Sequence, residues 1–255
     1  MAISSNSVIH YTKTIDNLKG ILKEQKFFLK YCTDYVRVNN VTIGQFELAV
    51  PMVCFCDIPF TEIHSLTNEY GCYGIGLSKK WAIKKRLNPV LYCETSSNLT
   101  QIIDSIYYLS NAISNYTEED VTVIRANRLQ NECEKLLGYV KNYQNISKNV
   151  GKIPADYKFY DEREWRYVPS KDDMKTQGVD LELLIPKENF ELDKDNYNTK
   201  AKHFSLDFDE TDITYIIVNK KREVADMLDF MKTIGIKTPE LCTKLISLEQ
   251  IEEDF

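Results

Sequence analysis

Residues 160–168 read Tyr160-Asp161-Glu162-Arg163-Glu164-Trp165-Arg166-Tyr167-Val168 and combine charged with aromatic side chains. Successive side chains of an extended strand point to opposite faces, which places Glu162, Glu164 and Arg166 on one face and Arg163, Trp165 and Tyr167 on the other. Two carboxylates and a guanidinium on one face predict an ion-paired cluster. Two interpretations follow: the strand directs a carboxylate into a cleft, or it is half exposed, with ion pairs in solvent that contribute little to stability.

The composition is that of a globular protein with a substantial core. The chain has 255 residues, of which 43% are hydrophobic and 11% aromatic, enough for one large domain or two small ones. Its formal net charge of −6 argues against broad binding to nucleic acid, which needs a basic surface.

The distribution of apolar residues and cysteines indicates a cytoplasmic protein. The sequence contains no apolar run of about 18 residues that would span a membrane, and its first residues lack the pattern of a signal peptide. The 7 cysteines are an odd number, which favours reduced thiols in a cytoplasm over a disulfide framework.

Apolar periodicity predicts an α+β fold with mixed or antiparallel strands early and late in the chain. Strands are expected at 7–12, 27–31, 49–58, 73–77, 90–93, 164–169, 181–185, 204–208, 213–218 and 244–248. Helices are expected at 16–22, 79–85 and 222–233, and a polar surface loop at 187–202. Apolar residues recur at helical spacing after residue 98, so we interpret residues 1–255 as one α+β domain with a helical insertion at 98–150.

Three separate segments supply side chains that could frame a nucleotide-sized cleft. His10-Tyr11-Thr12 ends the first strand, Tyr70 and Tyr73 lie mid-chain, and Glu164 comes late. In such a cleft a histidine can bind a ribose hydroxyl and a tyrosine can stack on a flat ring. A carboxylate can stabilise positive charge that develops on a sugar carbon. The alternative for an isolated histidine such as His10 is a purely structural role.

Two further groups of residues bear on ligands. Arg163 or Arg166 could hold a pyrophosphate through bidentate hydrogen bonds. Cys54 and Cys56 share one strand face and lie near His64 in the sequence, but no second pair of ligands at zinc spacing follows. We therefore expect core packing of these cysteines and no metal.

Several of these segments together resemble a known family, the AbiGi-type abortive phage infection proteins of bacteria. The resemblance covers most of the chain and is most specific at residues 60–92. The residues that carry it are His10-Tyr11-Thr12, Ala49–Pro59, His64, Tyr70–Ala82, Asn88–Tyr92 and Glu162–Arg166. It implies a role in anti-phage defence, as the antitoxin or sensing half of a two-component system.

The order of histidine, tyrosine and glutamate also resembles the ADP-ribosyltransferase superfamily, whose members use such a set around NAD. This resemblance implies an ADP-ribosyltransferase-like core, with NAD as substrate. It implies catalytic roles for His10, Tyr73 and Glu164, and NAD contacts from His10, Tyr11, Thr12, Tyr70 and Arg166. Tyr70 and Tyr73 remain alternatives to each other, as do Glu162 and Glu164.

Two classes of function follow from these observations. The first is an NAD-dependent ADP-ribosyltransferase that modifies a macromolecule during phage infection. The second is a non-catalytic antitoxin or infection sensor that binds a partner toxin or a phage protein. The acidic charge, the 16 tyrosines and a docking face on residues 98–149 favour the second class.

Overall fold

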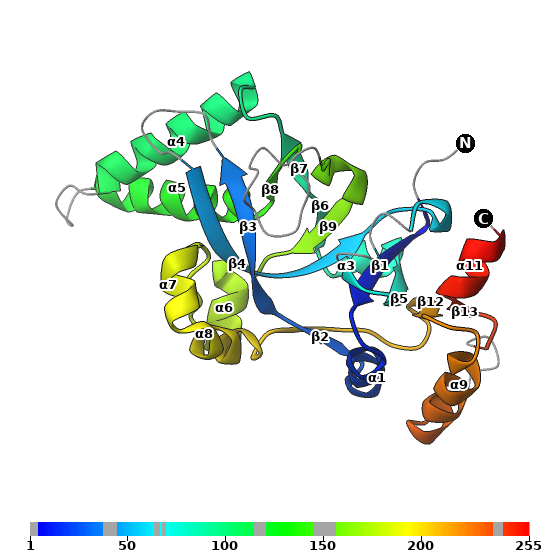
Figure 1. Ribbon diagram of the computed structural model, residues 1–255. Helices are drawn as coiled ribbons and strands as arrows, with labels where there is room; N and C mark the ends of the chain where they lie inside the picture. The colour runs from blue at the N-terminus through cyan, green and yellow to red at the C-terminus, as the bar shows by residue number, and fades with distance from the viewer. Residues whose placement is uncertain are drawn as a thin grey trace.

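The computed structural model describes residues 5–37, 45–63, 67, 70–114, 121–144, 157–236 and 242–254. His64, one of the residues considered for zinc and for the family resemblance, lies outside these ranges. The described residues form a mixed sheet with helices around it, which confirms the α+β class (Figure 1).

The central sheet runs in the order β13-β12-β5-β1-β4-β9-β6, and β3 and β10 also pair with β4. Its strand pairs are antiparallel except for β12 and β13, which are parallel. The strands of this sheet are β1 (Ser7–Thr12), β3 (Lys30–Arg37), β4 (Gln45–Cys56), β5 (Tyr73–Ser78), β6 (Asn88–Pro89), β9 (Glu164–Tyr167), β10 (Ile185–Pro186), β12 (Ile213–Val218) and β13 (Leu245–Ser247). Two small pairs accompany it: antiparallel β2 (Lys26–Phe28) with β11 (Ser205–Asp207), and parallel β7 (Leu91–Cys93) with β8 (Val140–Asn142).

Helices lie at both ends of the sheet (Figure 1). Those of the described residues are α1 (Ile15–Glu24), α3 (Lys79–Lys84), α4 (Asn98–Ser114), α5 (Val121–Gly138), α6 (Lys171–Gln177), α7 (Lys187–Leu192), α8 (Lys194–Ala201), α9 (Glu223–Thr233) and α11 (Leu248–Asp254). Short 3-10 turns, η1 (Phe60–Glu62) and η2 (Phe159–Glu162), precede β5 and β9. α4 and α5 lie side by side within the segment predicted as a helical insertion, and α9 and α11 lie at the opposite end, near β12 and β13 (Figure 1).

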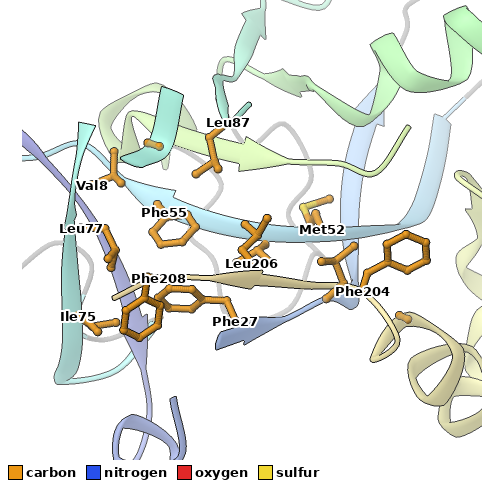
Figure 2. Packing of buried hydrophobic residues seen from close by; sticks show 14 of the residues in the cluster. Val8, Phe27, Met52, Phe55, Ile75, Leu77, Leu87, Phe204, Leu206 and Phe208 are labelled. Atoms are coloured by element: carbon orange, nitrogen blue, oxygen red, sulfur yellow. The ribbon is translucent and has the colours of Figure 1, made fainter. Parts of the chain in front are cut away.

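The long strand β4 joins the two halves of the sheet. Its first part, up to Met52, pairs with β3, and its last part, Val53 to Cys56, pairs with β9. The apolar run of β4 is buried because the β2–β11 pair packs across it, with Phe55 close to Phe27 and Leu206 (Figure 2). β4 therefore carries both the main core and the floor of the site described below.

The strand predicted at residues 164–169 begins where it was expected, as β9, but the charged residues before it are not extended. Residues up to Glu162 form η2, and Arg163 adopts a left-handed conformation (φ 45°) before β9 begins at Glu164. The reason is local: the Arg163 N–H donates to the carbonyl of Tyr160, which closes a helical turn where alternation suggested a strand. The polar side chains of β9 are buried and its aromatic ones half buried, so the interpretation as a solvent-exposed ion-pair ladder is wrong.

The polar segment at 187–202 was predicted as a surface loop and instead forms α7 and α8. Its few apolar residues are enough to hold it, because Phe190 and Ala201 are buried and Phe190 packs against Tyr31. The Asn198 side chain also accepts a hydrogen bond from the Tyr31 N–H, at 3.0 Å. Two more expectations change. Of the strand predicted at 181–185, only Ile185 is extended, as the first residue of β10, and α11 follows the last strand without having been predicted.

Candidate functional site

One cavity of about 820 Å³ lies beside the junction of β1, β4 and β9. His10, Tyr70 and Glu164 all line it, although they come from three distant segments. Tyr11, Thr12, Glu162 and Arg166 line it as well. The structure therefore brings together the histidine, one of the two tyrosines and both alternative glutamates.

Tyr73 is not at this cavity. Its hydroxyl donates a hydrogen bond to Glu223 Oε1, at 3.0 Å, near the start of α9. Of the two tyrosine alternatives it is Tyr70 whose hydroxyl reaches the cluster of charges, because it donates to Glu162 Oε1 at 2.8 Å. Arg163, the alternative pyrophosphate ligand, is likewise not among the residues that line the cavity.

A buried ion-pair cluster forms one wall of the cavity. Lys141 Nζ lies 2.7 Å from Glu162 Oε2 and 2.8 Å from Glu164 Oε2. Arg166 binds the same Glu164 carboxylate through two nitrogens, with Nε 2.5 Å from Oε1 and Nη2 3.0 Å from Oε2. All four residues are at least nine-tenths buried, so their mutual attraction is screened much less than at a surface.

Arg166 connects three parts of the fold. Besides Glu164, its guanidinium donates to the carbonyl of Gly138 at the end of α5 (3.1 Å) and to the carboxylate of Asp34 on β3. A cation at the carboxyl end of a helix also interacts favourably with the helix dipole. Arg166 thus fixes the end of α5 against β9 and β3.

The pKa values of the two glutamates move in opposite directions. Burial alone would raise the pKa of Glu164, but the Arg166 guanidinium and the Lys141 ammonium outweigh burial and hold that pKa far below its usual value. For Glu162, burial dominates over the attraction of Lys141, and the repulsion from Glu164 adds to it, so its pKa is raised. Of the two, Glu162 is the carboxyl group that more readily takes up a proton.

Lys141 stays charged in this environment. Burial would lower its pKa, but the carboxylates of Glu164 and Glu162 and the phenol of Tyr70 raise it well above the usual value. Its ammonium also lies over the ring of Phe159, 4.8 Å from the centroid, a cation–π contact that helps to offset the lost hydration.

His10 is neutral, and one of its ring nitrogens has a structural partner. Nδ1 lies 2.8 Å from the backbone carbonyl of Cys54; because a carbonyl only accepts, Nδ1 carries the proton. Burial lowers the pKa of His10, opposed by this hydrogen bond. The ring packs against Phe27 and Phe55. His10 therefore combines the structural role of a core histidine with a place on the cavity wall.

Tyr11 provides an unsatisfied polar group at the same cavity. Its hydroxyl is buried and has no hydrogen-bond partner among the described residues. Burial raises the pKa of this phenol well above its usual value, so it remains protonated and able to donate. A buried group of this kind is costly unless something binds it, which makes it a potential ligand contact.

The geometry restricts what Glu164 can do chemically. Both of its carboxylate oxygens are bonded to cations, Oε1 to Arg166 and Oε2 to Arg166 and Lys141. A carboxylate neutralised in this way is a weak partner for positive charge that develops on a bound sugar. Glu162, bonded by Lys141 and Tyr70, has the raised pKa typical of a group that can exchange a proton.

Sequence patterns did not reveal Lys141 or Asp34. Lys141 stands between Val140 and Asn142, and Asp34 lies within β3, so neither belongs to a recognisable motif. No local signal marks Lys141, because β8 is the short segment Val140-Lys141-Asn142 and two of its three residues are polar. Among the described residues, no three histidine, cysteine, aspartate or glutamate side chains converge as metal ligands.

Comparison with known proteins gives the family of this chain. A family model described as "Putative abortive phage resistance protein AbiGi, antitoxin" matches residues 25–219, which is more than half of the chain. The chain belongs to the AbiGi family. It is also 25% identical over 246 residues to the protein named "Abortive phage resistance protein AbiGi" of Lactococcus lactis subsp. cremoris, and the match covers 87% of this chain and 95% of that protein. The family resemblance seen in the sequence is therefore confirmed.

No solved structure matches this AbiGi-family chain. Within the described ranges, no helix combines the length and the apolar character needed to cross a membrane. The family match includes β4, the cavity residue Tyr70 and the whole ion-pair cluster, whereas His10 precedes its first residue. The cluster is thus part of the segment that the family model describes.

Proposed function

We propose that this protein serves in bacterial anti-phage defence as a non-catalytic antitoxin, which acts in the cytoplasm by binding a partner toxin. The family description, which includes the word antitoxin, supports this role. The structural observation that carries it is the state of Glu164: its carboxylate is buried and bonded by Arg166 and Lys141 at both oxygens. That arrangement is suited to holding the fold together more than to stabilising a reacting group.

Co-expression tests this proposal with the protein encoded by a neighbouring gene as the candidate toxin. We expect the wild-type protein to restore growth and to co-purify with the toxin. We expect the same of His10→Asn, which keeps a donor for the Cys54 carbonyl but removes the imidazole, and of Tyr70→Phe. Wild-type protein that neither neutralises nor binds this toxin contradicts the proposal. If both folded variants fail to neutralise the toxin, the claim that the protein acts without catalysis is contradicted.

A second candidate function is ADP-ribosyl transfer from NAD to a macromolecule on an ADP-ribosyltransferase-like core. It is supported by the meeting of His10, Tyr70, Glu162 and Glu164 at one cavity large enough for a nucleotide. In this case NAD is the substrate, with Thr12, Tyr11 or Arg166 as further contacts. The reaction would need Glu162, or a Glu164 released from its cations, to face the sugar.

Incubation with labelled NAD and cell extract tests the second candidate. An enzyme should lose about 100-fold or more of its labelling rate in Glu162→Gln or Glu164→Gln, because each change removes a charge but preserves shape. His10→Asn provides a third variant outside the ion-pair cluster. Equal labelling by wild type and all three folded variants, or none by wild type, would remove this candidate.

A further inference from the structure

Helix α4 presents an apolar seam that the rest of the described chain leaves uncovered. Leu99, Ile102, Ile106 and Leu109 are 41%, 54%, 37% and 56% exposed. Their spacing of three, four and three residues is the pattern of a helix that packs along another helix. The seam spans about 15 Å of helix at the usual rise per residue. Exposed apolar patches of this kind mark interaction sites in soluble proteins.

The opposite side of α4 is the one that packs on the protein. Thr100, Ile103 and Asp104 are buried there, with exposed fractions of 4%, 7% and 3%. Asp104 is also the single charged residue in the sequence of α4. The outer face of α4 therefore carries no charge, in a chain of which 27% is charged. Depletion of charge is the compositional mark of an interface core.

The seam has a symmetry that indicates its partner. Read from either end, it gives the same spacing and the same residue types: leucine, isoleucine, isoleucine, leucine. A two-fold axis near position 104 would place Leu99 opposite Leu109 of a second copy and Ile102 opposite Ile106 of that copy. Such self-matching is what an isologous two-fold interface requires.

We propose that α4 is the dimer interface of this protein, packed antiparallel against α4 of a second copy. Like residues then meet in both halves of the seam, and no like charges oppose each other. The side chains next to the seam on α4 are also neutral, as with Gln101 and Ser105. On the adjacent helix α5, Leu129 and Leu136 are 45% and 40% exposed and add apolar area to this end of the molecule (Figure 1).

Sedimentation equilibrium of the purified full chain tests the interface. We expect the wild type to dimerise, and Ile102→Lys to raise the dimer dissociation constant by about 100-fold or more, because symmetry buries the new charge twice. The matched control is Leu192→Lys, which adds the same charge at an 85% exposed apolar residue at the end of α7, outside the seam, and should leave the dimer intact. Circular dichroism confirms that both variants are folded.

A mixing experiment tests the antiparallel register. Ile106→Glu alone should also give monomers, but an equimolar mixture with Ile102→Lys should form heterodimers, since the introduced lysine of one copy then faces the introduced glutamate of the other. Wild type that stays monomeric up to its solubility limit overturns the proposal. A dimer that Ile102→Lys does not weaken overturns it too, and a mixture that remains monomeric overturns the antiparallel pairing. None of these readouts depends on toxin binding.

Discussion

Arg166→Met is expected to destabilise the protein by about 3–5 kcal/mol, the usual cost of removing one partner from a buried ion pair. Methionine fills much of the space of the arginine stem, so the loss is mainly electrostatic. It leaves the Asp34 carboxylate without this cation and the Glu164 carboxylate with Lys141 alone, and it removes the donor to the Gly138 carbonyl at the end of α5. Urea unfolding, monitored by circular dichroism, measures the change.

The matched control is Arg222→Met. Arg222 precedes α9, is exposed and makes no side-chain capping bond, so the same chemical change should alter stability by no more than about 0.5 kcal/mol. Equal free energies of unfolding for the two variants would mean that the guanidinium of Arg166 does not stabilise the fold. Adding Glu164→Gln to Arg166→Met should recover part of the loss, because it removes one of the carboxylates left behind.

Lys141→Met should lower the free energy of unfolding by a similar amount, about 3–5 kcal/mol near neutral pH, and this loss should depend on pH. The pKa of Glu162 is already raised by burial, and losing Lys141 removes the main influence that lowers it. The folded variant then binds a proton at Glu162 more tightly than the unfolded chain does. Stability contributed by such a group falls as pH rises from the unfolded pKa, about 4.3, through the raised folded pKa.

Glu164 also makes the stability lost in Lys141→Met larger at higher pH. In the wild type its pKa is held low, so its contribution is present above the unfolded pKa and lost as pH falls toward the folded pKa. Without Lys141 that contribution shrinks, so wild type and variant should differ most near pH 8 and least near pH 4. Urea unfolding at several pH values measures this difference. A gap that stays constant with pH, or widens in acid, would contradict the assignment of Lys141 as the counter-ion of both glutamates.

Local sequence patterns were sufficient for much of the fold and for part of the site. The strand at 213–218 has no competing pattern. The helix after it ends at Thr233, two residues before Gly235, which has the positive φ (86°) of a glycine that follows a helix. The charged face of Glu162, Glu164 and Arg166 was recognised as an ion-paired cluster from alternation alone, even though Glu162 belongs to η2 and not to the strand.

What was missed depends on contacts between distant segments. Lys141 joins the cluster only because β8 pairs with β7, and no local pattern shows that pairing. The helices at 187–201 contain too few apolar residues for helical periodicity to be evident, and packing against Tyr31 decides their conformation. The choice between Tyr70 and Tyr73 was open for the same reason, since alternation cannot tell which of two near neighbours reaches another segment.

The short parallel pair of β7 and β8 has a consequence for how this family can tolerate insertions and deletions. Lys141 lies opposite Tyr92 in that pair, and a slip of one residue would turn the ammonium to the other face of the strand. Glu162 and Glu164 would then be buried without the Lys141 ammonium. The residue opposite Tyr92, whose hydroxyl accepts a hydrogen bond from the Glu164 N–H, would also change. A single added or deleted residue between α5 and β8 should therefore lower stability far more than a longer change in an exposed turn. Hydrophobic contacts can rearrange after such a shift, whereas a buried ion pair requires one register of the two strands.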